Sequence, residues 1–126
     1  MEERKAQPDS KGAEALRLKT RLWIVDENDR IIMGEGRREI LETIDKTGSI
    51  NQTAKLMKMS YKAVWGKIKA TEKTLGRRIV HTDRKEGTHL TDAGRELLEK
   101  YRVLKEQCIA EENRMFSKLF RGQAPS

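Results

Sequence analysis

Apolar residues in the middle of the chain recur at helical spacing and predict three consecutive helices. In the first, residues 36–48 place Ile40, Leu41 and Ile44 on one helical face. Gly48 follows them, and glycine suits the left-handed conformation in which many helices end. We therefore expect the first helix to stop at this glycine.

A second helix is expected to begin directly afterwards. Ser49 and Gln52 have the spacing of a capping box, in which the two side chains satisfy amide groups at a helix start. The helix should be about two turns long and end near Lys58. The side chains expected to face inward are Ala54, Leu56 and Met57.

The third helix should start at the cap Ser60 and end before Gly76. At about 100° per residue, its two faces differ in chemistry. The expected core stripe is Val64, Ile68, Thr71 and Leu75. The opposite, exposed face holds Lys62, Gly66, Lys69 and Lys73, with Tyr61 and Trp65 along one border. An ordinary amphipathic helix explains this pattern, but so does a recognition helix that reads base edges with its first turn and holds phosphates with later lysines.

A short basic hairpin is predicted after the third helix. Residues 79–82 and 88–90 have strand-like composition and flank a turn at residues 83–87. A basic hairpin in this place is typical of a wing. Arg84 and Lys85 at its tip could grip phosphate or enter a minor groove.

The N-terminal part contains another predicted hairpin. Residues 16–26 alternate apolar and polar positions, and the polar turn Asp-Glu-Asn-Asp leads into Arg-Ile-Ile-Met. Residues 1–15 are charged and rich in small residues, which indicates a disordered tail rather than a secretory signal or an anchor. The longest apolar run, residues 22–25, is far short of the roughly 20 residues that a membrane span needs, so we expect a soluble, cytoplasmic protein.

One long helix is expected over residues 91–120, capped by Thr91. Its apolar stripe consists of Leu97, Tyr101, Leu104, Cys108, Met115 and Leu119, widened by Leu98, Phe116 and Phe120. The stripe could pack back on the domain or pair with another subunit. Because a small winged domain offers little core to cover so many side chains, we favour a homodimerisation helix over residues 91–121, with a tail at 122–126.

Positive charge is concentrated around the predicted third helix and wing. The formal net charge is +7, and residues 60–89 carry eight Lys and Arg against three Asp and Glu, so five of the seven excess charges lie there. Such a concentration suits a polyanion-binding surface, because each neutralised phosphate releases counterions. A solvated basic face without a partner is the alternative.

Catalysis, metals and cofactors are not expected. The lone G-x-G at residues 34–36 lacks a third glycine and is better explained as the turn from the first hairpin to the first helix. His81 and His89 could face each other across the wing, but two histidines lack the further ligands of a metal site. A single cysteine, Cys108, cannot form an internal disulfide.

Two stretches resemble a known family of regulators. Residues 48–65 (GSINQTAKLMKMSYKAVW) and 88–101 (THLTDAGRELLEKY) resemble the N-terminal DNA-binding domain of ModE-type molybdate-responsive regulators and, more distantly, the winged helix-turn-helix of LysR-type regulators. The similarity runs from about Leu16 to Tyr101. It implies a dimer that binds duplex DNA, with a DNA-facing turn at Ser60, Tyr61, Lys62 and Trp65.

The resemblance does not extend to the sensor. Full-length ModE-type regulators continue into molybdate-binding domains, whereas this sequence ends at Ser126 after one further helix. We therefore expect no oxyanion binding and no small-molecule effector site in this chain.

The expected fold is α+β and mainly α, a winged helix-turn-helix at residues 16–90 with an N-terminal hairpin and a long C-terminal helix. The expected function is that of a sequence-specific regulator of transcription that binds double-stranded DNA. The alternative is a protein-interaction adaptor that uses the long helix. RNA binding is a weaker third hypothesis. The candidate DNA-binding residues are Ser49, Gln52, Ser60, Tyr61, Lys62, Trp65, Gly66, Lys69, Lys73, Arg84 and Lys85.

Overall fold

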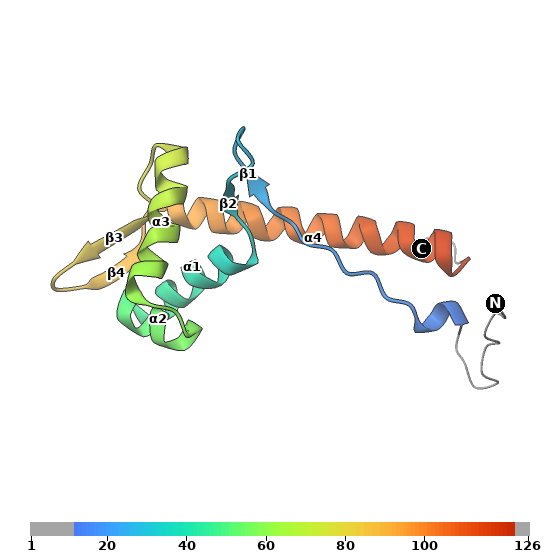
Figure 1. Ribbon diagram of the computed structural model, residues 1–126, viewed down its shortest axis with the longest axis horizontal. Coiled ribbons are helices and arrows are strands. Elements are labelled where there is room, and N and C mark those ends of the chain that lie inside the picture. Colours follow the sequence, from blue (N-terminus) through green and yellow to red (C-terminus); the bar gives the residue numbers. More distant parts are fainter. Residues whose placement is uncertain (1–11, 123–126) are drawn as a thin grey trace, which may run out of the picture. The chain divides into compact units, whose positions relative to one another are not determined.

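The computed structural model describes residues 12–122, so most of the predicted N-terminal tail and the last four residues lie outside the described part (Figure 1). The elements in chain order are the 3-10 helix η1 (Gly12–Ala15), β1 (Ile24–Val25), β2 (Ile31–Met33), α1 (Glu35–Thr47), α2 (Ile50–Met57), α3 (Tyr61–Leu75), β3 (Val80–Asp83), β4 (Gly87–Leu90) and α4 (Asp92–Phe120). The chain divides into two compact units, Arg21–Leu104 and a second one made of Met1–Thr20 with Lys105–Ser126.

The core of the larger unit lies where α1, α2, α3, the two hairpins and the first turns of α4 meet (Figure 1). Ile40, Leu41 and Ile44 are at most 1% exposed, which confirms the predicted inner face of the first helix. Burial of each such side chain favours folding by about 1.5–3 kcal/mol. The other buried core residues are Met33, Ile50, Ala54, Val64, Ile68, Ile79, Val80, Leu90, Leu98 and Tyr101.

The predicted boundary between the first two helices is confirmed, with one correction to the cap. Gly48 ends α1 with φ 68°, and the Ser49 hydroxyl accepts the Gln52 backbone N–H at 3.1 Å. The reciprocal half of the predicted capping box does not form through Gln52. Instead, the Ser49 N–H donates to the Thr47 hydroxyl at 3.2 Å. The orphan amide is thus satisfied from the preceding helix, which leaves the Gln52 side chain exposed.

The inner face of α2 differs in part from the prediction. Ala54 is buried and Met57 packs against the core, as expected. Leu56, however, is 65% exposed, so its predicted inward position is wrong. Ile50 and Thr53 are buried instead, because Thr53 and Ala54 follow Ile50 at spacings of three and four residues and so lie on the same helical face.

The predicted core stripe of α3 is confirmed in its first part and wrong at its end. Val64, Ile68 and Thr71 are buried as predicted, but Leu75 is 40% exposed. The last buried position is Glu72, a charged residue that is only 9% exposed. A charge is tolerated there because the carboxylate accepts hydrogen bonds from the chain that follows the helix.

The N-terminal hairpin is much shorter than the predicted one. β1 pairs with β2 through Ile24↔Met33 and Val25↔Ile31 only, and residues 16–23 belong to no strand. Residues 16–23 have no strand to pair with, because β2 ends at Met33 after only three residues. Gly34 then caps α1, which begins at Glu35, so the G-x-G lies where the first hairpin passes into the first helix, as predicted.

The long C-terminal helix is confirmed as α4, and the Thr91 hydroxyl caps it by accepting the Gly94 N–H at 3.1 Å. Leu98 and Tyr101 in its first turns are buried in the core of the larger unit. The Tyr101 hydroxyl donates to the Leu22 carbonyl at 2.8 Å. Burial, followed by the nearby carboxylate of Glu35, raises the pKa of this tyrosine.

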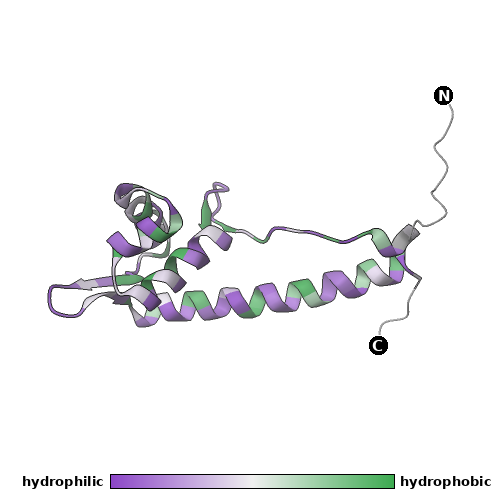
Figure 2. Ribbon diagram, turned by 90° about the horizontal axis from the view of Figure 1, so that it is seen from below, coloured by the Kyte–Doolittle hydropathy of each residue, from purple (hydrophilic) through white to green (hydrophobic). Residues whose placement is uncertain are grey.

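Farther along, α4 retains an exposed apolar surface. Figure 2 shows hydrophobic and hydrophilic residues alternating along the helix. The exposed apolar residues beyond residue 102 are Val103, Leu104, Ile109, Met115, Leu119 and Phe120. In the smaller unit, the Thr20 hydroxyl donates to the Glu112 carboxylate at 2.6 Å, so residues before β1 lie along this half of the helix. Within residues 12–122, no helix has the length and hydropathy to cross a bilayer.

Candidate nucleic-acid interface

The exposed face of α3 contains the basic and aromatic side chains that the sequence placed there. The Ser60 hydroxyl starts the helix by accepting the Ala63 N–H at 3.0 Å, as predicted. Tyr61 is 49% exposed, and Lys62 beside it is exposed as well. The further residues of this face are Gly66, Lys69 and Lys73, all exposed, while Trp65 is half-buried against the core.

Two neighbours hold Lys69 close to the helix surface. Its ammonium lies 4.9 Å from the centre of the Trp65 ring, within the range of a cation–π contact. The same nitrogen lies 3.4 Å from one carboxylate oxygen of Glu72. Lys69 is therefore oriented before any ligand arrives, although 59% of its side chain remains exposed.

The wing is a four-residue antiparallel ladder with its tip at residues 84–86. Asp83 closes the turn, because one of its oxygens accepts the backbone N–H groups of Lys85 at 2.7 Å and Glu86 at 3.3 Å. These two hydrogen bonds lower the pKa of the Asp83 carboxyl. Arg84 and Lys85 are exposed at the tip, as the sequence predicted.

The two wing histidines do face each other. His81 pairs with His89 in the ladder, and their rings meet edge to face with centroids 5.1 Å apart. Among residues 12–122, no group of three His, Cys, Asp or Glu side chains could hold a metal ion.

Backbone contacts attach the wing to the turn between α1 and α2. The Thr88 N–H donates to the Gly48 carbonyl at 2.9 Å. Gly87 has φ 81°, and a Cβ there would lie only 2.6 Å from the same oxygen. The wing can approach this turn so closely because Gly87 has no Cβ.

Sequence reasoning missed Glu72. Its second carboxylate oxygen accepts the N–H groups of Ile79 at 2.8 Å and Val80 at 3.3 Å, where the chain enters the wing. The signal that could have revealed it was its charge, because Glu72 is the single acid within an otherwise basic and apolar helix.

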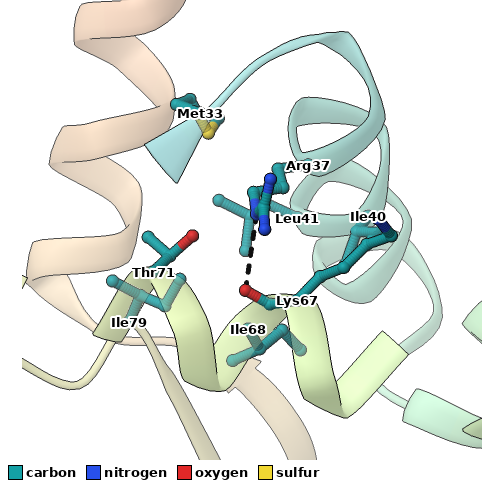
Figure 3. Close-up of a pocket in the computed structure, with 8 residues that line it drawn as sticks. All are labelled: Met33, Arg37, Ile40, Leu41, Lys67, Ile68, Thr71 and Ile79. Carbon is teal, nitrogen blue, oxygen red and sulfur yellow. Dashed lines mark hydrogen bonds between the residues drawn. The ribbon is translucent and has the colours of Figure 1, made fainter. Parts of the chain in front are cut away.

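The pocket between α1 and α3 is too small for a ligand (Figure 3). It offers about 10 Å³, room for roughly one water molecule. Arg37 lies over it and donates to the Lys67 carbonyl at 3.4 Å, and burial lowers the pKa of its guanidinium. A larger hollow of about 630 Å³ lies between the β1–β2 turn and α3, and its lining includes the charged residues Asp26, Glu27, Arg30 and Lys73.

Comparison with known proteins identifies the class of the domain. Residues 37–95 match the family described as bacterial regulatory helix-turn-helix protein, lysR family. They include α1, the helix-turn-helix pair α2 and α3, and the wing. This segment is a helix-turn-helix domain of the LysR type, which confirms the resemblance seen in the sequence.

Individual relatives agree with that assignment. The molybdenum transport protein ModE of Azotobacter vinelandii is 37% identical over 76 residues, which are 57% of this chain and 28% of ModE. The chain thus matches little more than a quarter of that relative's length. A DNA complex of the CbnR DNA-binding domain shares the fold with a TM-score of 0.55 and 22% identity, over 69% of this chain and 99% of that one. Full-length CbnR with its target DNA gives a TM-score of 0.54 and 22% identity, over 68% and 29% of the two chains.

Proposed function

We propose that this chain is a transcriptional regulator that binds double-stranded DNA and reads its sequence with α3. The observation that carries the proposal is the exposed basic and aromatic face of α3 beside a wing with Arg84 and Lys85 at its tip. A winged domain can insert such a helix into the major groove while the wing holds the backbone or an adjacent minor groove.

The position of each candidate residue suggests its role. Tyr61 and Lys62, in the first turn of α3, are placed to reach base edges, and the exposed backbone at Gly66 allows DNA to approach closely. The later lysines of α3 and the wing tip are suited to phosphates, as are the polar side chains of the half-buried Ser49 and the exposed Gln52 at the start of α2.

We further propose that the chain acts as a homodimer in the cytoplasm, with α4 as the dimerisation helix. Leu119 is 68% exposed and Phe120 55%, so the apolar surface near the end of α4 is available to a second copy. A single recognition helix reads only a few base pairs, and two subunits could read half-sites about 34 Å apart.

The function is tested by fluorescence anisotropy with a site selected from random duplexes and with random DNA, at several salt concentrations. Arg84→Ala should weaken binding to both DNAs alike and reduce the slope of log K against log salt by about one, because one phosphate contact is lost. Lys62→Ala should change the preferred sequence. Lys118→Ala removes a basic residue outside the interface and serves as the control. If no complex forms with either DNA at low salt, the proposal is wrong and the adaptor alternative gains support.

The dimer is tested separately by sedimentation at micromolar concentration. The intact chain should sediment as a dimer, and Leu119→Glu should produce a monomer that keeps weak half-site binding but loses tight binding to a palindromic site. Lys118→Glu introduces a glutamate at the neighbouring, exposed position, with an even larger change of charge, and should leave the dimer intact. A monomeric wild-type chain with full affinity for one half-site would contradict the proposed assembly.

A further inference from the structure

Glu72 contacts two different parts of the candidate DNA-binding surface. It lies in the last turns of α3, and its side chain is only 9% exposed. Its two carboxylate oxygens face different partners: one contacts the chain entering the wing, and the other contacts Lys69 on the exposed face of α3. A single side chain therefore joins the recognition helix to the wing.

The first contact fixes where the wing begins. Gly76 ends α3 in the left-handed conformation, and within three residues the N–H of Ile79 reaches the Glu72 carboxylate at 2.8 Å. The N–H of Val80, the first residue of β3, reaches the same oxygen at 3.3 Å. Hydrogen bonds to an ionised acceptor are stronger than neutral ones, so this contact sets how the wing leaves the helix.

The second contact orients a cation on the exposed face. Lys69 lies between the carboxylate of Glu72, 3.4 Å away, and the ring of Trp65. An i,i+3 ion pair whose lysine is mostly exposed contributes little to stability. Its effect on binding can be larger, because a lysine held in one orientation loses less conformational freedom when it meets a phosphate.

We propose that Glu72 is a positioning residue for DNA recognition, which keeps Lys69 and the wing tip at fixed places relative to each other. This inference rests on the proposed DNA-binding function. A preferred site must engage the first turn of α3, Lys69 and the wing at the same time, so it depends on that fixed spacing. Random DNA can be bound by any subset of the cations, so its binding depends much less on this fixed spacing.

Glu72→Gln separates the two contacts of the carboxylate. The amide oxygen can still accept the N–H groups of Ile79 and Val80, but the charge that holds Lys69 is gone. Affinity for the preferred site should fall by about threefold to tenfold, while affinity for random DNA stays the same or rises, so the ratio of the two falls. Glu39→Gln removes an exposed acid of α1, which is not among the candidate DNA-binding residues, and should leave that ratio unchanged.

Glu72→Ala removes both contacts, and a double-mutant cycle with Arg84→Ala measures the coupling to the wing. In the Glu72→Ala background, Arg84→Ala should change affinity for the preferred site much less than it does in the wild type. In the Glu72→Gln background, Arg84→Ala should keep most of its effect. All affinities are measured well below the unfolding temperature of the least stable variant, so that loss of folded protein does not contribute.

If Glu72 had a purely structural role, its substitution would lower the affinity for the preferred site and for random DNA by the same factor. The effect of Arg84→Ala would then be the same in the Glu72→Ala background as in the wild type. An unchanged ratio in Glu72→Gln, together with an unchanged effect of Arg84→Ala in Glu72→Ala, would overturn the inference while the proposed function stands. If the wild-type chain binds no duplex DNA, the proposed function is wrong and the inference falls with it.

Discussion

Replacing Gly94 by alanine should destabilise the winged domain, although alanine is the better helix former. Gly94 lies in the first turn of α4, directly against the chain that enters the wing. A Cβ there would lie 2.1 Å from the Ile79 carbonyl oxygen and 3.0 Å from its carbonyl carbon. These are backbone atoms, so no side-chain rotation can relieve the overlap.

The expected loss of stability follows from these distances. A carbon and a carbonyl oxygen in contact are normally about 3.3 Å apart, so α4 and β3 must separate by about 1 Å. The same carbonyl accepts the Thr91 N–H at 3.0 Å, and the displacement would lengthen that bond. Overpacking typically destabilises by about 1–3 kcal/mol and a lost hydrogen bond by about 1 kcal/mol, against a gain of about 1 kcal/mol from helix propensity. The net loss is about 2 kcal/mol, or roughly 10 °C in Tm for a domain of this size.

Gly66→Ala provides the matched control. It is also a glycine inside a helix, but a Cβ at this position meets no atom within 4 Å. Propensity alone should therefore stabilise this variant by up to about 1 kcal/mol. Thermal and urea unfolding followed by circular dichroism measure both changes. If Gly94→Ala is as stable as the wild type, or gains as much as Gly66→Ala, the close contact between α4 and Ile79 does not exist.

Two further predictions concern binding and pH. Gly66→Ala should weaken binding to the preferred DNA site several-fold in anisotropy titrations, because its new methyl group lies on the proposed DNA-facing surface; unchanged affinity would exclude this part of α3 from the interface. Although partial burial raises the pKa of Glu42, its bonds and charge interactions with Arg102 and Arg38 lower it below the ordinary 4.5. A lowered pKa stabilises the fold above the unfolded value, and this stabilisation is lost as pH falls through the folded value. Urea unfolding should therefore show a stability difference between wild type and Glu42→Gln that shrinks between about pH 5 and pH 3, and a difference independent of pH would contradict the ion-pair assignment.

Features set by local backbone chemistry were predictable from the sequence. The helix ends at Gly48 and Gly76 and the starts at Ser49 and Ser60 depend on a few neighbouring residues, and the structure has them where the sequence placed them. The exposed face of α3 was predictable for a similar reason, because lysines are rarely buried without a partner.

Features set by tertiary neighbours were not predictable in the same way. Leu56 and Leu75 looked like core residues by type and spacing, yet both side chains are exposed. Glu72 is buried because of amide groups that come from a later segment, and helical periodicity says nothing about those. Residues 16–23 alternate like a strand, but whether a strand forms depends on the length of its partner. The DNA-contacting roles of the candidate residues stay predictions until the binding experiments are made.

The way the wing is attached has a consequence for redesign of the domain. Its second strand is held beside the tip by the Gly48 carbonyl, which accepts the Thr88 N–H, while Asp83 closes the tip by accepting hydrogen bonds from backbone amides. Neither attachment uses the side chains of residues 84–86. The tip can therefore be exchanged for loops of different charge or length, and under the proposed function a series of grafted tips should change the affinity for DNA without changing the preferred sequence.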